Sequence, residues 1–148
     1  MRSEGNERQI VVDKMESLIA AARGARDQSI APFSHFLVGA ALETAAGKVY
    51  TGCNVESASF GLTVCAERVA IWKALSEGER DFTALAVVAD TDSLTPPCGT
   101  CRQIIWEFAK QATIVLANLH EQREQVNILD LLPRAFDARF LAEAKHGK

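Results

Sequence analysis

The chain has 148 residues, of which 48% are hydrophobic and 24% are charged, and it carries a formal net charge of −3. These values are typical of one globular domain, expected over residues 1–148, whose core needs no disulfide bonds. No apolar stretch approaches the ~18–20 residues of a membrane helix, and the polar N-terminal segment lacks signal-peptide character. Lys and Arg residues scattered among 19 acidic ones disfavour a polynucleotide partner. We expect a cytoplasmic protein that acts on a small molecule, without nucleic acid or membrane as a partner.

The first half of the chain has the pattern of one helix followed by a pair of strands. Apolar residues recur along one helical face over 11–22, and Pro32 lies beyond the end of this periodicity. Residues 36–43 and 48–55 are predicted strands. They are joined by a short turn in which Gly47 can adopt a positive φ, so a hairpin-like connection is expected.

Helices and strands alternate in the second half. The predicted elements are, in order, a helix over 65–76 ended by Gly78, a buried strand over 84–90, a helix over 101–108 and a buried strand over 113–118. From Ile128 the chain is predicted to be mostly helical or irregular, with one or two short elements. This order predicts an α/β layer architecture whose second half is mostly parallel.

The four cysteines are Cys53, Cys65, Cys98 and Cys101. An even number could form two disulfides, but a chain of this size with a sufficient core and no signal segment has little need of them. Metal binding or redox chemistry is therefore the leading explanation. Cys53 is expected to be a small buried thiol without a role in either.

Cys98 and Cys101 form a Cys-x-x-Cys pair that follows a predicted strand and opens a predicted helix. Residues i and i+3 share one face of the first helical turn, where the helix dipole and the free amides stabilise thiolates. These features suit a thioredoxin-like redox pair and a metal site equally well. The pair alone therefore leaves both interpretations open.

The segment Cys65-Ala66-Glu67 favours the metal. Cys65 also opens a predicted helix, and a third thiolate would give zinc three protein ligands and an open fourth position, as in catalytic sites. Glu67 could then lie beside a zinc-bound water. Arg68 is placed to hydrogen-bond the thiolates and to offset their charge. The simpler alternatives are an exposed glutamate in a first helical turn and a surface salt bridge of Arg68.

Three segments, APFSHFLVGAAL, NVESASFGLTVCAERVA and PPCGTCRQ, resemble the small cytidine deaminases that form homotetramers. The resemblance extends from about residue 10 to Phe136, and the paired cysteine motifs are highly specific in their order and separation. It implies a three-layer α/β/α fold around a five-stranded mixed sheet. It also implies one zinc ion per chain on Cys65, Cys98 and Cys101.

The resemblance further implies the reaction. A zinc-bound hydroxide would attack C4 of cytidine or 2'-deoxycytidine, while Glu67 shuttles protons to N3 and to the departing amine. The products would be the uridines and ammonia. Deaminases of polynucleotides or of the free base typically carry His at the position of Cys65, so this cysteine favours a free nucleoside.

By the same resemblance, Asn54 and Glu56 would hold the 3'-hydroxyl of the sugar. Phe36 would stack on the pyrimidine. For an aromatic residue the simpler alternative is core packing.

Four further residues are expected to complete the pocket. The Ala66 amide would meet the carbonyl oxygen of the base, and the Pro97 carbonyl would accept from the exocyclic amine. Phe60, from a neighbouring subunit, and Phe136 would close the pocket. The chain differs from the usual family residues at Phe33, Ser57, Phe60 and Pro97.

Other residues have no predicted role in the chemistry. Arg102 and Gln103 are expected to be structural, and three histidines lack metal-ligand spacing: His35, His120 and His146. The alternatives to a cytidine deaminase are a deaminase of another aminopyrimidine nucleoside, such as a blasticidin-like antibiotic, a dithiol oxidoreductase and a structural zinc module.

Overall fold

A five-stranded mixed sheet forms the centre of the molecule in the computed structural model, which describes residues 4–144. The strands are β1 (Val38–Thr44), β2 (Val49–Cys53), β3 (Phe82–Ala89), β4 (Thr113–Asn118) and β5 (Arg123–Val126). Their order in the sheet is β2-β1-β3-β4-β5. β3 and β4 pair in parallel, and the other neighbouring strands pair antiparallel.

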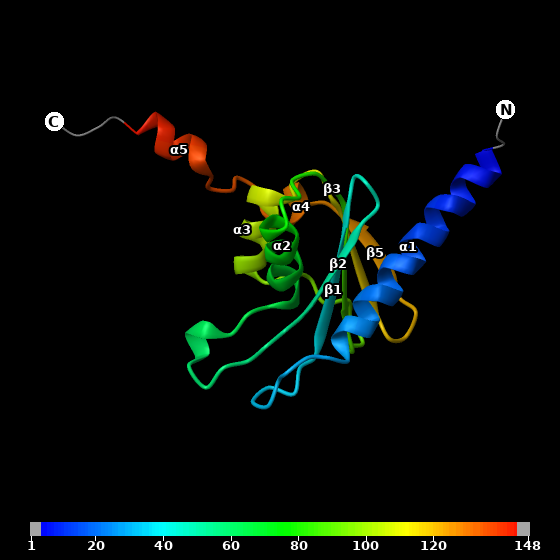
Figure 1. Cartoon of the computed structure of the whole chain (residues 1–148), viewed down its shortest axis with the longest axis horizontal. Coiled ribbons are helices and arrows are strands. Elements are labelled where there is room, and N and C mark those ends of the chain that lie inside the picture. Colours follow the sequence, from blue (N-terminus) through cyan, green and yellow to red (C-terminus); the bar gives the residue numbers. More distant parts are fainter. Residues whose placement is uncertain (1–3, 145–148) are drawn as a thin grey trace.

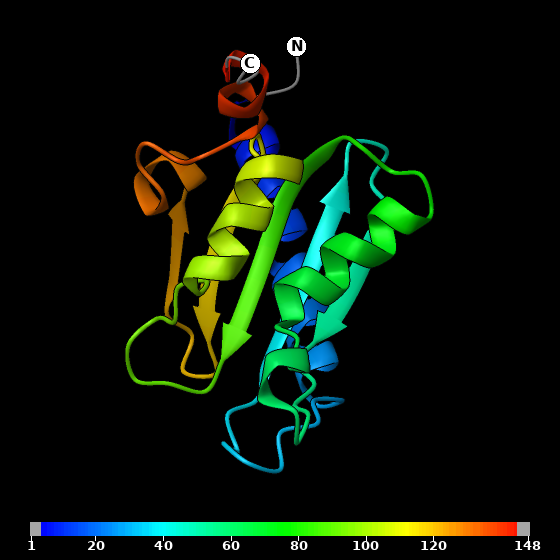
Figure 2. The ribbon, with the colours of Figure 1, turned by 90° about the vertical axis from the view of Figure 1, so that its left-hand side faces the viewer.

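Helices cover both faces of this sheet. α1 (Glu4–Arg26) lies along one face, whereas α2 (Ala66–Ser76), α3 (Gly99–Phe108) and the short α4 (Ile128–Leu131) lie on the other (Figures 1 and 2). α5 (Ala138–Glu143) projects away from the sheet beyond α3 (Figure 1). This arrangement confirms the expected three-layer α/β/α fold.

Alternation along the strands divides the buried side chains into two layers. In β3, Leu85 and Val87 pack with α2 and α3, whereas Ala86 and Val88 pack with α1. β1 and β4 alternate in the same way, because successive strand residues point to opposite faces. Strands that are buried on both faces have continuous apolar sequences, which explains why the runs at 84–90 and 113–118 show no alternation.

Gly52 lets α2 lie very close to β2. A Cβ atom at this position would overlap the carbonyl oxygen of Ala66 and would lie 2.6 Å from the amide nitrogen of Ala70. A glycine is therefore required for this close approach. The contact fixes the first turn of α2, which carries Glu67, directly over the sheet.

The turn predictions are confirmed, whereas the prediction for the second half needs a correction. Gly47 and Gly78 adopt positive φ angles of 84° and 95°. β5 pairs antiparallel with β4, so the second half of the sheet contains one parallel pair rather than being mostly parallel. β5 has the sequence REQV and lies at the sheet edge, largely exposed, so no apolar pattern marks it. Three short elements follow β4, one more than expected.

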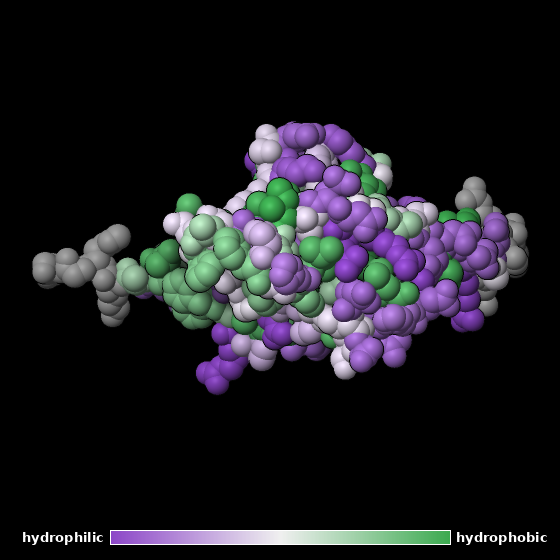
Figure 3. Space-filling model, turned by 90° about the horizontal axis from the view of Figure 1, so that it is seen from below, coloured by the Kyte–Doolittle hydropathy of each residue, from purple (hydrophilic) through white to green (hydrophobic). Residues whose placement is uncertain are grey.

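α1 is longer than predicted, and its N-terminal half extends past the sheet (Figure 1). Val11 is consequently 59% exposed, although it shares the periodicity of the buried Leu18 and Ile19. Figure 3 shows mostly hydrophilic side chains on the α1 side of the lower face and more hydrophobic ones towards α5. None of the helices within residues 4–144 has the length and apolar character to span a bilayer. His146 lies outside the described residues.

Candidate active site

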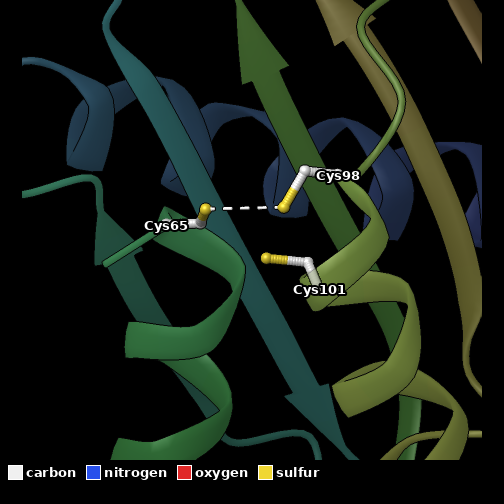
Figure 4. Close-up of side chains that lie close together, drawn as sticks. All are labelled: Cys65, Cys98 and Cys101. Carbon is white, nitrogen blue, oxygen red and sulfur yellow. Dashed lines mark hydrogen bonds between the residues drawn. The ribbon is translucent and has the colours of Figure 1, made fainter. Parts of the chain in front are cut away.

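Three cysteines meet where α2 and α3 begin. Cys65 is the N-cap residue of α2, Cys98 is the N-cap residue of α3, and Cys101 lies in the first turn of α3. Their sulfur atoms point towards one another from the two helices (Figure 4) and all lie within 4.8 Å of one another. Cys101 is buried, Cys65 is half-buried and Cys98 is exposed. Within residues 4–144, this is the one group of three or more side chains that could hold a metal ion.

The geometry of these sulfurs fits zinc. Zinc–sulfur bonds of about 2.3 Å at tetrahedral angles place two ligand sulfurs about 3.8 Å apart. The Cys65 and Cys98 sulfurs are 3.7 Å apart. Three protein ligands leave a fourth position for water, which is the pattern of catalytic rather than structural zinc. The expected cysteine triad is thereby confirmed, and the Cys-x-x-Cys pair is part of a three-thiol cluster rather than an isolated redox pair.

The three thiols of the cluster influence one another's protonation. A hydrogen bond from the Cys101 thiol, with help from Arg68, lowers the pKa of Cys65 to about 5. That same hydrogen bond, together with burial, raises the pKa of Cys101 above its usual range. Three neighbouring thiolates repel one another, so without a cation the cluster retains protons. A bound metal ion takes the place of those protons, because metal ligation requires thiolates.

Arg68 lies one turn after Cys65 and reaches back to it. Its Nη2 atom lies 3.6 Å from the Cys65 sulfur and donates to the Thr63 carbonyl at 3.2 Å. The guanidinium also lies over the Trp72 ring, 5.5 Å from its centroid. The Nε atom of Arg68 is buried without a hydrogen-bond partner. The guanidinium is thus held beside the thiolates by contacts that leave its positive charge available to them.

Glu67 is the second residue of α2 and is only 4% exposed. Burial raises its pKa to about 7, because the low-dielectric surroundings disfavour the charged form. Its side chain lines a cavity of about 280 Å³ together with Cys65 and Cys98. A carboxyl group with this pKa can both take and give a proton near neutral pH.

The cavity is at the small end of the range for ligand pockets, about 300–1,000 Å³, so it suits a molecule of nucleoside size. Its walls come from β1, β3, the start of α2 and the loops next to them. The lining residues are Ser34, Phe36, Val38, Asn54, Glu56, Thr63, Val64, Cys65, Glu67, Val87, Thr95, Pro96 and Cys98. Seven residues were predicted to contact the substrate, and three of them, Phe36, Asn54 and Glu56, line this cavity together with Glu67.

Asn54 and Glu56 follow β2 and are fixed by different contacts. The Asn54 side chain accepts from the Val38 amide at 2.8 Å and donates to the Phe36 carbonyl at 2.7 Å. Glu56 accepts from the Phe33 amide at 2.9 Å and from the amide and hydroxyl of Ser34. The Ser34 hydroxyl, with the two amides, keeps the pKa of Glu56 below its usual range. The carboxylate is therefore ionised and oriented before any ligand arrives.

The three residues predicted to contact the base lie differently with respect to the cavity. Phe36 is 40% exposed and lines the cavity. Ala66 is buried and opens α2, where the first amides have no intrahelical acceptor. Pro97 is buried outside the cavity wall, and its carbonyl accepts from Nε of Arg102 at 2.8 Å. Pro96 lines the cavity in its place.

Phe60 and Phe136 lie outside this cavity. Phe60, in the 3-10 turn η1 (Phe60–Leu62), is 74% exposed and packs edge-on against Phe33, with ring centroids 5.6 Å apart. Phe136 is 57% exposed and stacks on Phe140 beside a separate surface hollow between α3 and α5. Within one chain the cavity therefore contains neither aromatic ring.

Ser34, Thr95 and Pro96 line the cavity although the sequence analysis assigned no role to them, and Arg102, which was expected to be structural, supports the site from outside the cavity. Arg102 donates to the Pro97 carbonyl and, through Nη1, to the Leu131 carbonyl at 2.9 Å, so it ties the loop before Cys98 to α4. Both acceptors are backbone carbonyls whose positions depend on how the chain folds, so no residue pattern predicts these contacts. Ser34 lies in the segment APFSHFLVGAAL, and Pro96 and Arg102 lie in PPCGTCRQ; membership of these segments was the signal that the sequence offered for them.

Comparison with known proteins places this site in a family. The model of the cytidine and deoxycytidylate deaminase zinc-binding region matches residues 12–117. The chain is 47% identical to a cytidine deaminase of Sporosarcina psychrophila, covering 88% of this chain and 96% of that protein. It is 48% identical to a cytidine deaminase of Halalkalibacterium halodurans, with 83% and 94% covered.

A solved structure of a cytidine deaminase is similar to this chain in both fold and sequence. The crystal structure of cytidine deaminase from Burkholderia pseudomallei matches with a TM-score of 0.80 and 48% identity, covering 82% of this chain and 98% of that one. The matched family region includes all three clustered cysteines and Glu67. The chain therefore belongs to the cytidine deaminase family.

Proposed function

We propose that this chain converts cytidine and 2'-deoxycytidine to uridine and 2'-deoxyuridine, with water consumed and ammonia released. The observation that carries the proposal is the layout of the cavity. Three zinc-binding thiols and a buried carboxyl group stand at one end, and an oriented carboxylate and amide stand at the other. A nucleoside has the matching polarity, because its reactive amino group and its sugar hydroxyls lie at opposite ends.

Glu67 is the residue to which we assign the proton transfers. Zinc held by the three cysteines would supply Lewis acidity, which would activate a water molecule at neutral pH. Glu67 accepts a proton from that water and delivers it to N3, which makes C4 electrophilic. The hydroxide left from that water adds to C4, Glu67 carries the second water proton to the 4-amino nitrogen, and the C4–N4 bond breaks, so that the C4 carbonyl forms and ammonia leaves. Its burial and raised pKa support this double role.

The cavity walls orient the substrate. Phe36 offers its ring to the pyrimidine, and the Ala66 amide is free to donate to the carbonyl oxygen of the base. We propose that a backbone carbonyl of the Thr95–Pro97 segment accepts a hydrogen bond from the exocyclic amine. The Pro97 carbonyl accepts from Arg102 and retains a second lone pair for the amine, and Pro96 lines the cavity beside it. One N–H of Asn54 and one lone pair of Glu56 remain for the 3'-hydroxyl.

The proposal is tested by incubating the zinc-loaded protein with cytidine and following uridine and ammonia. We expect one ammonia for each uridine. The same assay is repeated with 2'-deoxycytidine and with the antibiotic blasticidin S. It separates the proposed activity from that of a deaminase for modified nucleosides. Turnover of blasticidin S with inert cytidine would replace our assignment by that alternative, and no turnover of any of the three would refute it.

We also propose a homotetramer in the cytoplasm. Phe60 and Phe136 are large, exposed aromatic residues outside their own chain's cavity, which supports their use at a neighbouring subunit. The metal-binding thiols must stay reduced, and the cytoplasm is a reducing compartment. Light scattering should give four times the chain mass, and a monomeric, fully active protein would contradict the assembly.

A further inference from the structure

Ser34 stands between the part of the cavity that we assign to the sugar and the part that we assign to the base. We propose that Ser34 is a positioning residue that couples the two. Its single hydroxyl holds Glu56 on one side and the backbone of Phe36 on the other. The inference rests on the proposed function, because it assigns nucleoside contacts to Glu56 and Phe36.

The contacts of Ser34 are directional. Its hydroxyl donates to one carboxylate oxygen of Glu56 and accepts from the Phe36 amide at 3.1 Å. Its own amide donates to the second carboxylate oxygen at 3.2 Å, beside the Phe33 amide at 2.9 Å. Any shift of the hydroxyl therefore moves the carboxylate and the aromatic residue together.

The backbone between Ser34 and Phe36 is shaped to make this link. His35 donates its amide to the Ala31 carbonyl at 3.0 Å and adopts a φ of 57°, in the left-handed region. A non-glycine residue there is uncommon and is maintained only when its surroundings fix it. The tight turn brings the Phe36 amide back onto the Ser34 hydroxyl.

These contacts leave Glu56 with one defined lone-pair position for a ligand. A carboxylate offers about four lone-pair positions, and three donors from Phe33 and Ser34 occupy three of them. One position remains for a hydroxyl of the ligand. The Ser34 hydroxyl decides which one, because it is the only side-chain donor among the three. Loss of this hydroxyl leaves Oε1 of Glu56 without its donor, whereas the two amides still hold Oε2, so the carboxylate can turn about that remaining contact.

Ser57 provides a matched control. Its hydroxyl accepts from the Ser59 amide at 3.1 Å, two residues ahead, as the Ser34 hydroxyl accepts from the Phe36 amide. Ser57 is not among the cavity-lining residues, and no hydrogen bond joins its hydroxyl to Glu56 within the described residues. The two serines thus share the local turn and differ in the carboxylate contact.

The experiment compares Ser34→Ala, Ser34→Thr and Ser57→Ala with the wild-type zinc-loaded protein. The substrates are 2'-deoxycytidine and 2',3'-dideoxycytidine, which differ only in the 3'-hydroxyl. For Ser34→Ala we expect kcat/KM on 2'-deoxycytidine to fall roughly tenfold, mainly through KM, as loss of a hydrogen bond to a charged group predicts. On 2',3'-dideoxycytidine the fall should be about threefold at most, because only the Phe36 contact is lost.

The controls decide between positioning and simple loop support. Ser34→Thr keeps the hydroxyl and should remain within about threefold of wild type, and Ser57→Ala should not change either substrate. Zinc content and the thermal midpoint should be unchanged in all three variants. Equal losses on both substrates, equal losses in both alanine variants, or an unaffected Ser34→Ala would overturn the coupling. Wild-type protein that turns over neither substrate nor cytidine would instead refute the proposed function and the inference with it.

Discussion

The two ends of the cavity are built from different kinds of structure. At the metal end, Cys65, Glu67 and Cys101 lie at the first turns of α2 and α3, which pack on the sheet. At the opposite end, which we assign to the sugar, Glu56 and the neighbouring Phe36 lie in two loops that are held to each other by hydrogen bonds through residues 33–34. Glu67 and Cys101 at the metal end are buried, whereas Ser34 and Phe36 in the loops are exposed.

This difference follows from what each end has to do. Proton transfer requires donor and acceptor within hydrogen-bond distance, so groups placed on packed helices suit the chemistry. The sugar end has to admit and release a ligand, which favours segments with few buried contacts. Substitutions at the metal end should therefore abolish metal binding or kcat, and substitutions at the loop end should act mainly on KM and specificity.

The largest effect is expected from Cys98→Ala. The variant removes one of three ligands from an exposed position, so the fold should persist while zinc content falls from one per chain to near zero. Deaminase activity should be lost with the metal. Cys53→Ala is the matched control, because Cys53 lies in β2 and its thiol contacts the Gln28 carbonyl at 3.4 Å. Metal analysis checks both variants, and full zinc retention by Cys98→Ala would contradict the assigned ligand set.

Glu67→Gln should keep zinc but lose nearly all turnover. The amide preserves the size of the side chain in its buried position and cannot carry protons. General acid–base residues contribute about 10²–10⁴-fold, and a residue with two transfers should lie at the upper end of that range. Single-turnover rates with cytidine measure the loss. A variant within tenfold of wild type would mean that another group carries the protons.

Glu56→Gln should separate recognition from chemistry. The substitution removes the charge to which we assign the sugar hydroxyl, so kcat/KM for cytidine should fall roughly ten- to a hundredfold. Free cytosine has no sugar, and its slow turnover should be unchanged. The measurement is the ratio of kcat/KM for the two substrates. If both fall by the same factor, Glu56 acts on the metal end rather than on the sugar.

The same contrast explains what the sequence could predict. The metal end was predictable, because Cys65, Cys98 and Cys101 carry their chemistry in residue type and spacing, and helix starts follow from local pattern. The exposed edge strand REQV gave no signal, since it buries no alternate residues. The loop contacts also gave none, because a hydrogen bond such as that from Arg102 to the Pro97 carbonyl depends on where the backbone turns.

The smallest effect is expected at His35, whose left-handed backbone belongs to the loop end. Glycine adopts this conformation freely, so His35→Gly should alter the free energy of unfolding by no more than about 1 kcal/mol and kcat/KM by less than about twofold. A β-branched side chain is poorly tolerated there, so His35→Val should lose about 1–3 kcal/mol and should raise KM as the turn relaxes. Thermal unfolding and steady-state kinetics of the two variants measure both quantities. A valine variant as stable as wild type would show that the turn does not depend on the left-handed residue.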